Sequence, residues 1–198
     1  VLAKTKEAAA NLSEQIQNFE FEKNYQAVVC GNLREDFGTF EDYLLKNGKT
    51  NKTEVVKAGT PGARKAELHY ELIDCIETKE GVLTWILVIL HTGRHHQIRV
   101  QFASRGLGLY GDTKYNSKFQ KTKKKYTEIG LYSTRISFNH PVTGERMTFK
   151  IEPSGEAFEK MDVEAFSKIA LPAIYWWCYF CIHIYVYFLA LYSHILDK

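Results

Sequence analysis

Apolar residues recur along this 198-residue chain with two different periods, and the change of period separates helices from strands. Near the start, apolar positions three or four residues apart predict an amphipathic helix over 4–19. The residues on this face are Ala8, Leu12, Ile16 and Phe19. The three residues that open the chain, 1–3, have the composition of a strand.

Most of the remaining pattern has the two-residue period of half-buried strands. The predicted strands are residues 23–31, 65–76, 82–90, 129–138 and 146–151. The strand 82–90 is apolar almost throughout, which indicates burial on both faces. Residues 32–64 alternate glycine-rich polar stretches with short apolar runs, which indicates a strand-and-loop excursion. Helices are expected from just after Gly93 to about Ser104, and over 156–169.

This order of elements predicts an α+β fold in which a mixed, mostly antiparallel sheet carries a few flanking helices. We assign residues 1–170 to one domain and residues 171–198 to a hydrophobic tail. Residues 174–196 are long and apolar enough to span a bilayer, but no basic cluster flanks them. We interpret the tail as an unrelated or artefactual segment, and membrane association through it is the alternative.

Charge and cysteine content narrow the function classes only slightly. The formal net charge is +3, too small to indicate nucleic-acid binding by itself. Five lysines lie within eight positions, and such a run is either a solvated loop or a phosphate-contacting loop. They are Lys118, Lys121, Lys123, Lys124 and Lys125.

The start of the chain has no signal-peptide pattern, and its four cysteines are scattered. We therefore expect reduced thiols and a cytoplasmic protein. Cys178 and Cys181 are spaced like half a zinc site, but no second pair stands at a suitable distance. A site built on His91 and His95 lacks a nearby acidic ligand, so we predict no metal.

The densest polar cluster directly follows the buried strand 82–90. Residues 92–99 read T-G-R-H-H-Q-I-R, and residues 111–115 read G-D-T-K-Y. A polar cluster at the end of a buried strand is typical of an active site or an anion-binding turn. These residues resemble the signature T-G-R-x-H-Q-I-R, then G-D-x-x-Y, of the RluA-like pseudouridine synthases.

Further blocks in the same order extend the resemblance over residues 1 to about 168. Residues 23–31 are similar to the family pattern K-x-Y-x-A-x-V-x-G. Residues 131–145 resemble the closing L-H-A…F-x-H-P-x-T-G-E, and residues 149–153 match F-x-x-x-P. One departure is Gly108, which stands where the family usually has proline, so we expect a looser loop there.

The resemblance implies isomerisation of specific uridines to pseudouridine in ribosomal or transfer RNA. The family uses no cofactor, and an aspartate acts as nucleophile. That aspartate belongs to an H-R-L-D motif, which occurs nowhere in the printed sequence. We therefore expect a partial catalytic domain that does not turn over alone and is monomeric. A non-catalytic RNA-binding protein is the alternative.

The resemblance also assigns residues to the site. It implies that Arg99 pairs with the nucleophile, that Tyr25 stacks on the uracil and takes part in proton transfer at C5, and that Leu131 walls the pocket. His96 and Gln97 would brace the loop. The expected substrate contacts are Arg94, His96, Gln97, Leu131, Lys123 and Lys124.

From the residues alone, simpler interpretations stay open. Arg99 could form a structural ion pair, and Tyr25 could be an ordinary strand aromatic. Asp112 is interpreted as a turn-and-cap residue, and His95 is expected to share a helix face with Arg99.

Overall fold

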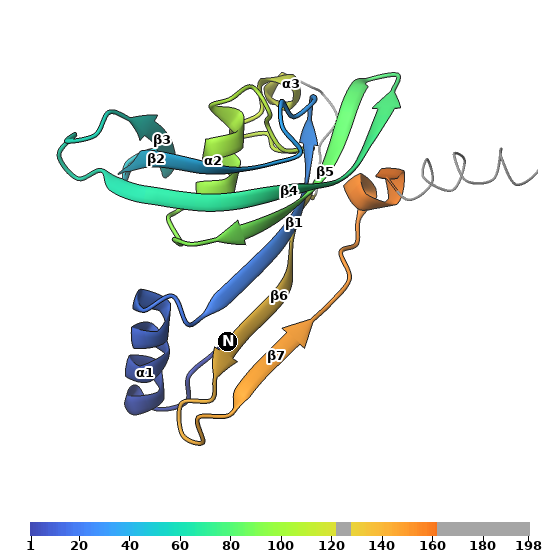
Figure 1. Ribbon diagram of the computed structural model, residues 1–198. Coiled ribbons are helices and arrows are strands. Elements are labelled where there is room, and N and C mark those ends of the chain that lie inside the picture. The colour runs from blue at the N-terminus through green and yellow to red at the C-terminus, as the bar shows by residue number, and fades with distance from the viewer. Residues whose placement is uncertain (122–127, 162–198) are drawn as a thin grey trace, which may run out of the picture. The chain divides into compact units, whose positions relative to one another are not determined.

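The computed structural model describes residues 1–121 and 128–161 (Figure 1). These residues form a seven-stranded sheet with helices packed beside it. The elements are α1 (Lys6–Gln17), β1 (Glu22–Cys30), β2 (Phe37–Asn47), β3 (Lys52–Val56), β4 (Arg64–Thr78), β5 (Gly81–Leu90), α2 (Gln97–Ala103), α3 (Ser117–Gln120), β6 (Leu131–Asn139) and β7 (Arg146–Lys150).

The strands lie in the order β3-β2-β4-β5-β1-β6-β7, and each described pairing is antiparallel. The expected pairing of residues 65–76 with 82–90 is the β4–β5 hairpin, which closes at Thr78 and Gly81. The prediction of a mostly antiparallel α+β sheet is confirmed. The prediction for residues 1–3 is wrong, since they form no strand.

The sheet is covered on both faces at its centre, which explains the apolar composition of β5. Alternate residues of β1 belong to two separate core clusters, because successive side chains of a strand point to opposite faces. Ala27 and Val29 pack with Ile98 and Phe102 of α2. Val28 packs into the cluster on the other face.

Helix α1 is shorter than predicted, and it buries only part of the expected face. Its N-cap is Thr5, whose hydroxyl accepts a hydrogen bond from the Ala8 amide. The buried residues are Leu12 and Gln15, whereas Ile16 on the expected face is exposed. Gln15 exchanges two hydrogen bonds with the backbone of Asn139, at 2.7 and 2.8 Å, and this polar contact fixes the rotation of the helix.

Helix α2 begins at Gln97, three residues later than the sequence predicts. His96 lies in the left-handed region (φ 55°), which a right-handed helix does not contain. His95 therefore precedes the helix, and the expectation that it shares a helix face with Arg99 is wrong.

Residues 156–161 are helical, as predicted, and the rest of that predicted helix lies outside the described residues. The hydrophobic tail also lies outside them. Among the described residues, no helix is long and apolar enough to cross a membrane.

Candidate active site

The loop 92–96 is anchored to β4 by the side chain of Gln97, which is 3% exposed. The Gln97 Oε1 atom accepts hydrogen bonds from the Thr92 hydroxyl at 2.8 Å and the Arg94 amide at 2.9 Å. Its Nε2 atom donates to the Glu67 carbonyl at 3.0 Å. Every polar atom of this buried amide has a partner, so the loop has a fixed position at the end of β5.

Arg99 extends from the first turn of α2 into a bidentate ion pair with Asp112. The Nε atom donates to Oδ2 at 2.8 Å, and Nη2 donates to Oδ1 at 2.7 Å. The Arg99 side chain is 15% exposed and that of Asp112 is fully buried. The structure thus contains the ion pair that the simpler interpretation of Arg99 invokes, with a partner from the loop after α2.

Asp112 also organises its own turn. Its Oδ1 atom accepts hydrogen bonds from the amides of Lys114 at 2.9 Å and Tyr115 at 3.1 Å. Burial by itself would raise the pKa of this carboxyl, but the bonds from Arg99 and the two amides outweigh burial and hold the pKa below its usual value. Asp112 is therefore a charged turn residue, as its place in the sequence indicates.

Tyr115 covers the other side of the Arg99 guanidinium, whose central carbon lies 4.9 Å from the ring centroid. The Tyr115 hydroxyl accepts a hydrogen bond from the Thr53 amide and lies 2.9 Å from His96 Nδ1. The direction of the bond between the hydroxyl and Nδ1 depends on which ring nitrogen of neutral His96 carries the proton. Thr53 belongs to β3, so Tyr115 links the edge of the sheet to the ion pair between Arg99 and Asp112.

His96 and His95 are both stabilised in the neutral form. Burial, followed by the positive charge of Arg99, lowers the pKa of His96 to about 4. Burial also lowers the pKa of His95, with Lys46 as the next contributor. The two rings lie 3.8 Å apart, and His95 Nδ1 is 2.8 Å from the Thr53 hydroxyl. At neutral pH these imidazoles act as hydrogen-bonding groups rather than as cations.

Tyr25 on β1 and Leu131 on β6 lie on the same face of the sheet as α2. Both are half-buried and pack against the cluster that contains Ile98 and Phe102. Within the described residues, Arg99 contacts Asp112 and Tyr115, and Tyr25 is not among its hydrogen-bond or ring partners. The structure thus brings the predicted aromatic wall to the face that α2 covers.

Lys23 connects the same strand to the signature loop, a placement that the sequence did not indicate. A Cβ atom built on Gly93 would lie 3.3 Å from the Lys23 ammonium, so this side chain reaches the loop. Burial lowers the pKa of Lys23. Lys23 precedes Tyr25 by two positions, and the motif K-x-Y therefore meets the motif T-G-R in space.

The remaining predicted residues are less central or lie elsewhere. Arg94 is half-buried, and its Nε donates to the Lys65 carbonyl at 2.9 Å. Lys123 and Lys124 lie outside the described residues. Within residues 1–121 and 128–161, no group of three or more His, Cys, Asp or Glu side chains could hold a metal ion.

The expectation of a looser loop at Gly108 is wrong. The Gly108 carbonyl accepts hydrogen bonds from the Cys30 amide at 3.0 Å and from Asn116 Nδ2 at 2.9 Å. A Cβ atom at position 108 would lie 2.7 Å from two atoms of the Asn116 side chain. The glycine permits this close approach, so the loop that carries Asp112 is tightly packed.

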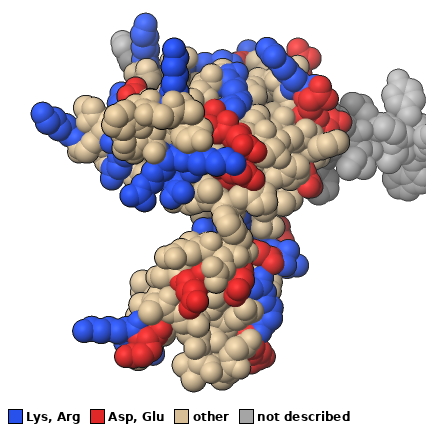
Figure 2. All heavy atoms as spheres, turned by 60° about the vertical axis from the view of Figure 1, so that its left-hand side comes forward, with Lys and Arg blue, Asp and Glu red and all other residues tan. Residues whose placement is uncertain are grey.

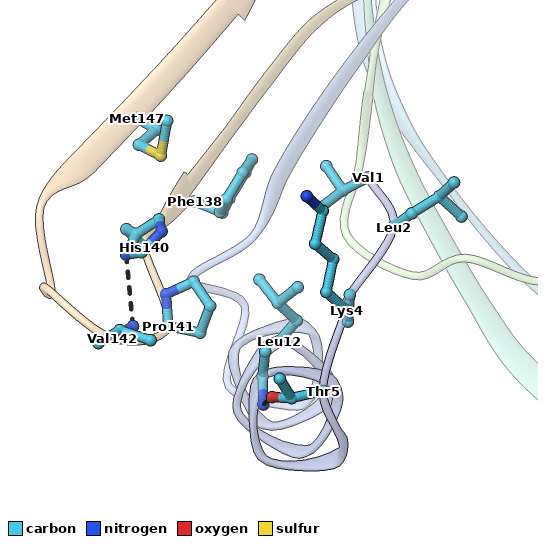
Figure 3. A pocket seen from close by; sticks show the side chains of 12 residues that line it. Val1, Leu2, Lys4, Thr5, Leu12, Phe138, His140, Pro141, Val142 and Met147 are labelled. Carbon is cyan, nitrogen blue, oxygen red and sulfur yellow. Dashed lines mark hydrogen bonds between the residues drawn. The ribbon is translucent and has the colours of Figure 1, made fainter.

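A hollow of about 450 Å³ lies at the opposite end of β6, between the first residues of the chain, α1 and the β6–β7 turn (Figure 3). Its lining is largely apolar and includes Leu12, Phe138 and Met147. None of the residues that the sequence predicts for the site lines it. We therefore place the candidate active site at α2 rather than in this hollow.

Comparison with known proteins gives the family. Residues 1–104, more than half of the chain, match the RNA pseudouridylate synthase family. The chain belongs to this family. The prediction drawn from the signature at residues 92–99 is thereby confirmed.

Relatives of this RNA pseudouridylate synthase family member include an uncharacterized RNA pseudouridine synthase of Aquifex aeolicus, 32% identical over 157 residues. The alignment covers 77% of this chain and 48% of that protein. Ribosomal large subunit pseudouridine synthase D of Pseudomonas aeruginosa is 30% identical over 161 residues, covering 76% of this chain and 48% of the relative. The chain thus spans about half the length of the curated relatives it matches.

The fold agrees with the family. The structure of human RNA pseudouridylate synthase domain containing 1 superposes with a TM-score of 0.62 at 18% identity, covering 76% of this chain and 62% of that one. Human RNA pseudouridylate synthase domain containing 4 gives a TM-score of 0.57 at 17% identity, with coverage of 76% and 64%.

The motif that contains Asp112 and Tyr115 was found from the sequence, but the contact of these two residues with Arg99 was not. The G-D-x-x-Y spacing was visible in the sequence, yet nothing in it showed that this loop folds back onto Arg99. Thr53 was missed entirely, because a threonine on an edge strand carries no distinguishing signal.

Proposed function

We propose that this chain forms part of the catalytic domain of an RNA pseudouridine synthase, which converts uridine in RNA to pseudouridine. The observation that carries the proposal is the guanidinium of Arg99, at the end of the family signature, whose position is fixed by Asp112 and Tyr115. The face that carries α2 also holds Tyr25 and Leu131, the aromatic and aliphatic walls expected for a uracil pocket.

The reaction breaks the bond between ribose C1′ and uracil N1, turns the base, and forms a bond from C1′ to C5. The C5 proton then leaves, and N1 is protonated, so the product is an isomer of the substrate. A carboxylate nucleophile needs a fixed cation beside it to stay ionised and oriented. Arg99 meets this requirement because its own position is fixed by Asp112 and Tyr115.

The guanidinium retains hydrogen-bonding capacity for such a carboxylate. Asp112 accepts from Nε and Nη2, and Nη1 has no hydrogen bond within the described residues. We infer that Nη1 is directed to the nucleophile. The chain's own part of the mechanism is then to orient that carboxylate through Arg99 and to stack the flipped uracil on Tyr25.

We infer ribosomal RNA as the first substrate to test, because a relative from Pseudomonas aeruginosa is named a ribosomal large subunit pseudouridine synthase. The alternative is RNA binding without turnover. Catalysis and binding without turnover differ in one measurable product, since only the enzyme releases the C5 hydrogen of uridine.

The test is tritium release from ribosomal RNA labelled at uridine C5. We compare the chain alone with the chain extended at its start by a segment that carries the family's H-R-L-D motif. We expect release only from the extended protein, because the printed sequence lacks that motif. Release by the chain alone would contradict the requirement for the aspartate.

Arginine variants of the extended protein supply the control. Arg99→Lys keeps the charge but loses the bidentate geometry, and we expect turnover to fall by roughly 100-fold. Arg105→Lys alters an equally bidentate pair with Asp42, and we expect a change under about threefold because that pair lies away from α2's first turn. A folded extended protein that binds RNA but releases no tritium would refute the proposed function.

A further inference from the structure

Positive charge is concentrated on the hairpin formed by β2 and β3. Residues 46–57 contain four lysines and one carboxylate, a net charge of +3, which equals the formal charge of the whole chain. The four are Lys46, Lys49, Lys52 and Lys57. Figure 2 shows basic side chains gathered on the upper part of the visible face, which carries this hairpin.

These lysines are not neutralised by neighbouring carboxylates. Within residues 1–121 and 128–161, none of the four forms an ion pair, and neither does Lys114, which faces the hairpin. Lys65 on β4 behaves differently, because it contacts Glu41 and Glu67 at 3.0 Å each. The hairpin therefore presents cations that are available to an anionic ligand.

A polar hollow lies where the hairpin meets the segment after Asp112. It has a volume of about 310 Å³, at the lower end of the range for small-ligand sites, which starts at roughly 300 Å³. Lys52 and Lys114 contribute cations to its lining, and Asn47, Thr50, Tyr115 and Gln120 contribute hydrogen-bonding groups. The Lys114 ammonium donates to the Asn51 carbonyl at 2.5 Å, which holds the side chain at the hairpin end.

The positive charge around the hollow also acts on His95, which lies beside it in the signature loop. Lys46 and Lys114 both contribute, after burial, to the lowered pKa of His95. One carboxylate, Glu54, also lines the hollow and opposes an anion there. Two cations against one anion leave the hollow positive.

We propose that the hollow between the β2–β3 hairpin and Lys114 binds a backbone phosphate of single-stranded RNA, with Lys52 and Lys114 as its two cations. The identity of the nucleic acid as RNA rests on the proposed function. A concave polar site fits a phosphate of a flexible strand. A lipid surface would require apolar side chains for insertion, and within residues 46–57, the basic end of the hairpin, the one large exposed apolar residue is Val55 at 37%.

The test is binding of the full chain to a uridine-rich single-stranded RNA of about 20 nucleotides, by fluorescence anisotropy over a range of NaCl concentrations. Lys52→Gln with Lys114→Gln should lower the slope of log K against log salt by about 0.7, because the two lysines neutralise one phosphate and each neutralised phosphate contributes about 0.7. Affinity at low salt should fall by roughly tenfold or more. Lys79→Gln, a matched exposed lysine between Glu77 and Glu80, should change neither quantity.

Two further variants guard against a folding effect, since Lys114 also holds the hairpin. Lys52 has no hydrogen bond from its side chain in the described residues, so Lys52→Gln alone should lower the slope by roughly half of the change in the double variant. Glu54→Gln removes the opposing carboxylate and should raise affinity by severalfold, which a loss of folding cannot do.

An unchanged slope in the double variant, an equal loss in Lys79→Gln, or no RNA binding by the wild-type chain would each overturn the subsite. Binding to vesicles of phosphatidylserine in place of RNA would overturn it as well. Tritium release by the extended protein is measured separately. Catalysis with an unchanged slope would reject the subsite alone, and a changed slope without catalysis would reject the proposed function alone.

Discussion

Asp112→Asn breaks the ion pair on which the geometry of Arg99 depends. The substitution keeps the size of the side chain, and its oxygen can still accept from the amides of the turn. It replaces an acceptor of Arg99 with an NH₂ donor, and it leaves a guanidinium that is 15% exposed without its counter-charge. Asp112 itself is fully buried, so water does not replace the lost partner.

The expected cost follows from these contacts. The hydrogen bond from Arg99 Nε loses its acceptor, and the bond from Nη2 loses its charged partner. A charge-assisted hydrogen bond is worth about 1.5–3 kcal/mol, and breaking a buried pair typically costs about 3–5 kcal/mol. Because the arginine retains some access to solvent, we expect the free energy of unfolding to fall by about 3 kcal/mol. Urea unfolding followed by circular dichroism should show a midpoint lower by about 1–2 M.

Controls separate the pair from a general effect of the substitution. Asp74→Asn alters a half-buried carboxylate that accepts from the Cys75 amide and forms no ion pair in the described residues, and it should cost under about 1 kcal/mol. Arg99→Gln combined with Asp112→Asn should cost less than the sum of the single changes, because no unpaired charge remains.

The pair also has a defined pH dependence. The pKa of Asp112 is lower in the folded than in the unfolded protein, so its stabilisation is present above about pH 4, the unfolded value, and is lost as pH falls through the folded pKa. The gap between wild type and Asp112→Asn should narrow in acid. A cost under about 1 kcal/mol at pH 7, or one equal to that of Asp74→Asn, would refute this account of the pair.

Three further predictions address the surroundings of the pair. Gly108→Ala places a methyl group 2.7 Å from Asn116 and should lower the unfolding free energy by about 1–3 kcal/mol in urea titrations, whereas Gly48→Ala, with open space around it, should be close to neutral. The pKa of His96, about 4, lies below the unfolded value of about 6.5, so stability should fall by about 1–2 kcal/mol as pH drops from 6.5 towards 4, and His96→Gln should reduce that slope to the part that His95 contributes. Tyr115→Phe removes the acceptor of a β3 amide and should cost about 1–3 kcal/mol in the same assay; a neutral result would mean that water replaces the hydroxyl.

The sequence by itself determined the strands and the family. Strand positions follow from local periodicity, and the apolar run of β5 indicated a strand covered on both faces. The polar signature could be read because its residues are contiguous in the chain. The motif at Asp112 and Tyr115 was equally visible, although the sequence could not show that it returns to α2.

Tertiary structure alone decided how α1 is rotated, where α2 begins and which groups hold Arg99. Gln15 is buried because it finds two backbone partners 124 residues away, and no local pattern encodes such a distant contact. The start of α2 depends on Gln97, whose amide holds the preceding loop against β4. The environment of Arg99 combines a helix, a loop and the edge strand that contains Thr53. Hydrophobic periodicity reports which face of an element is buried, whereas long-range polar contacts select the partners that meet there.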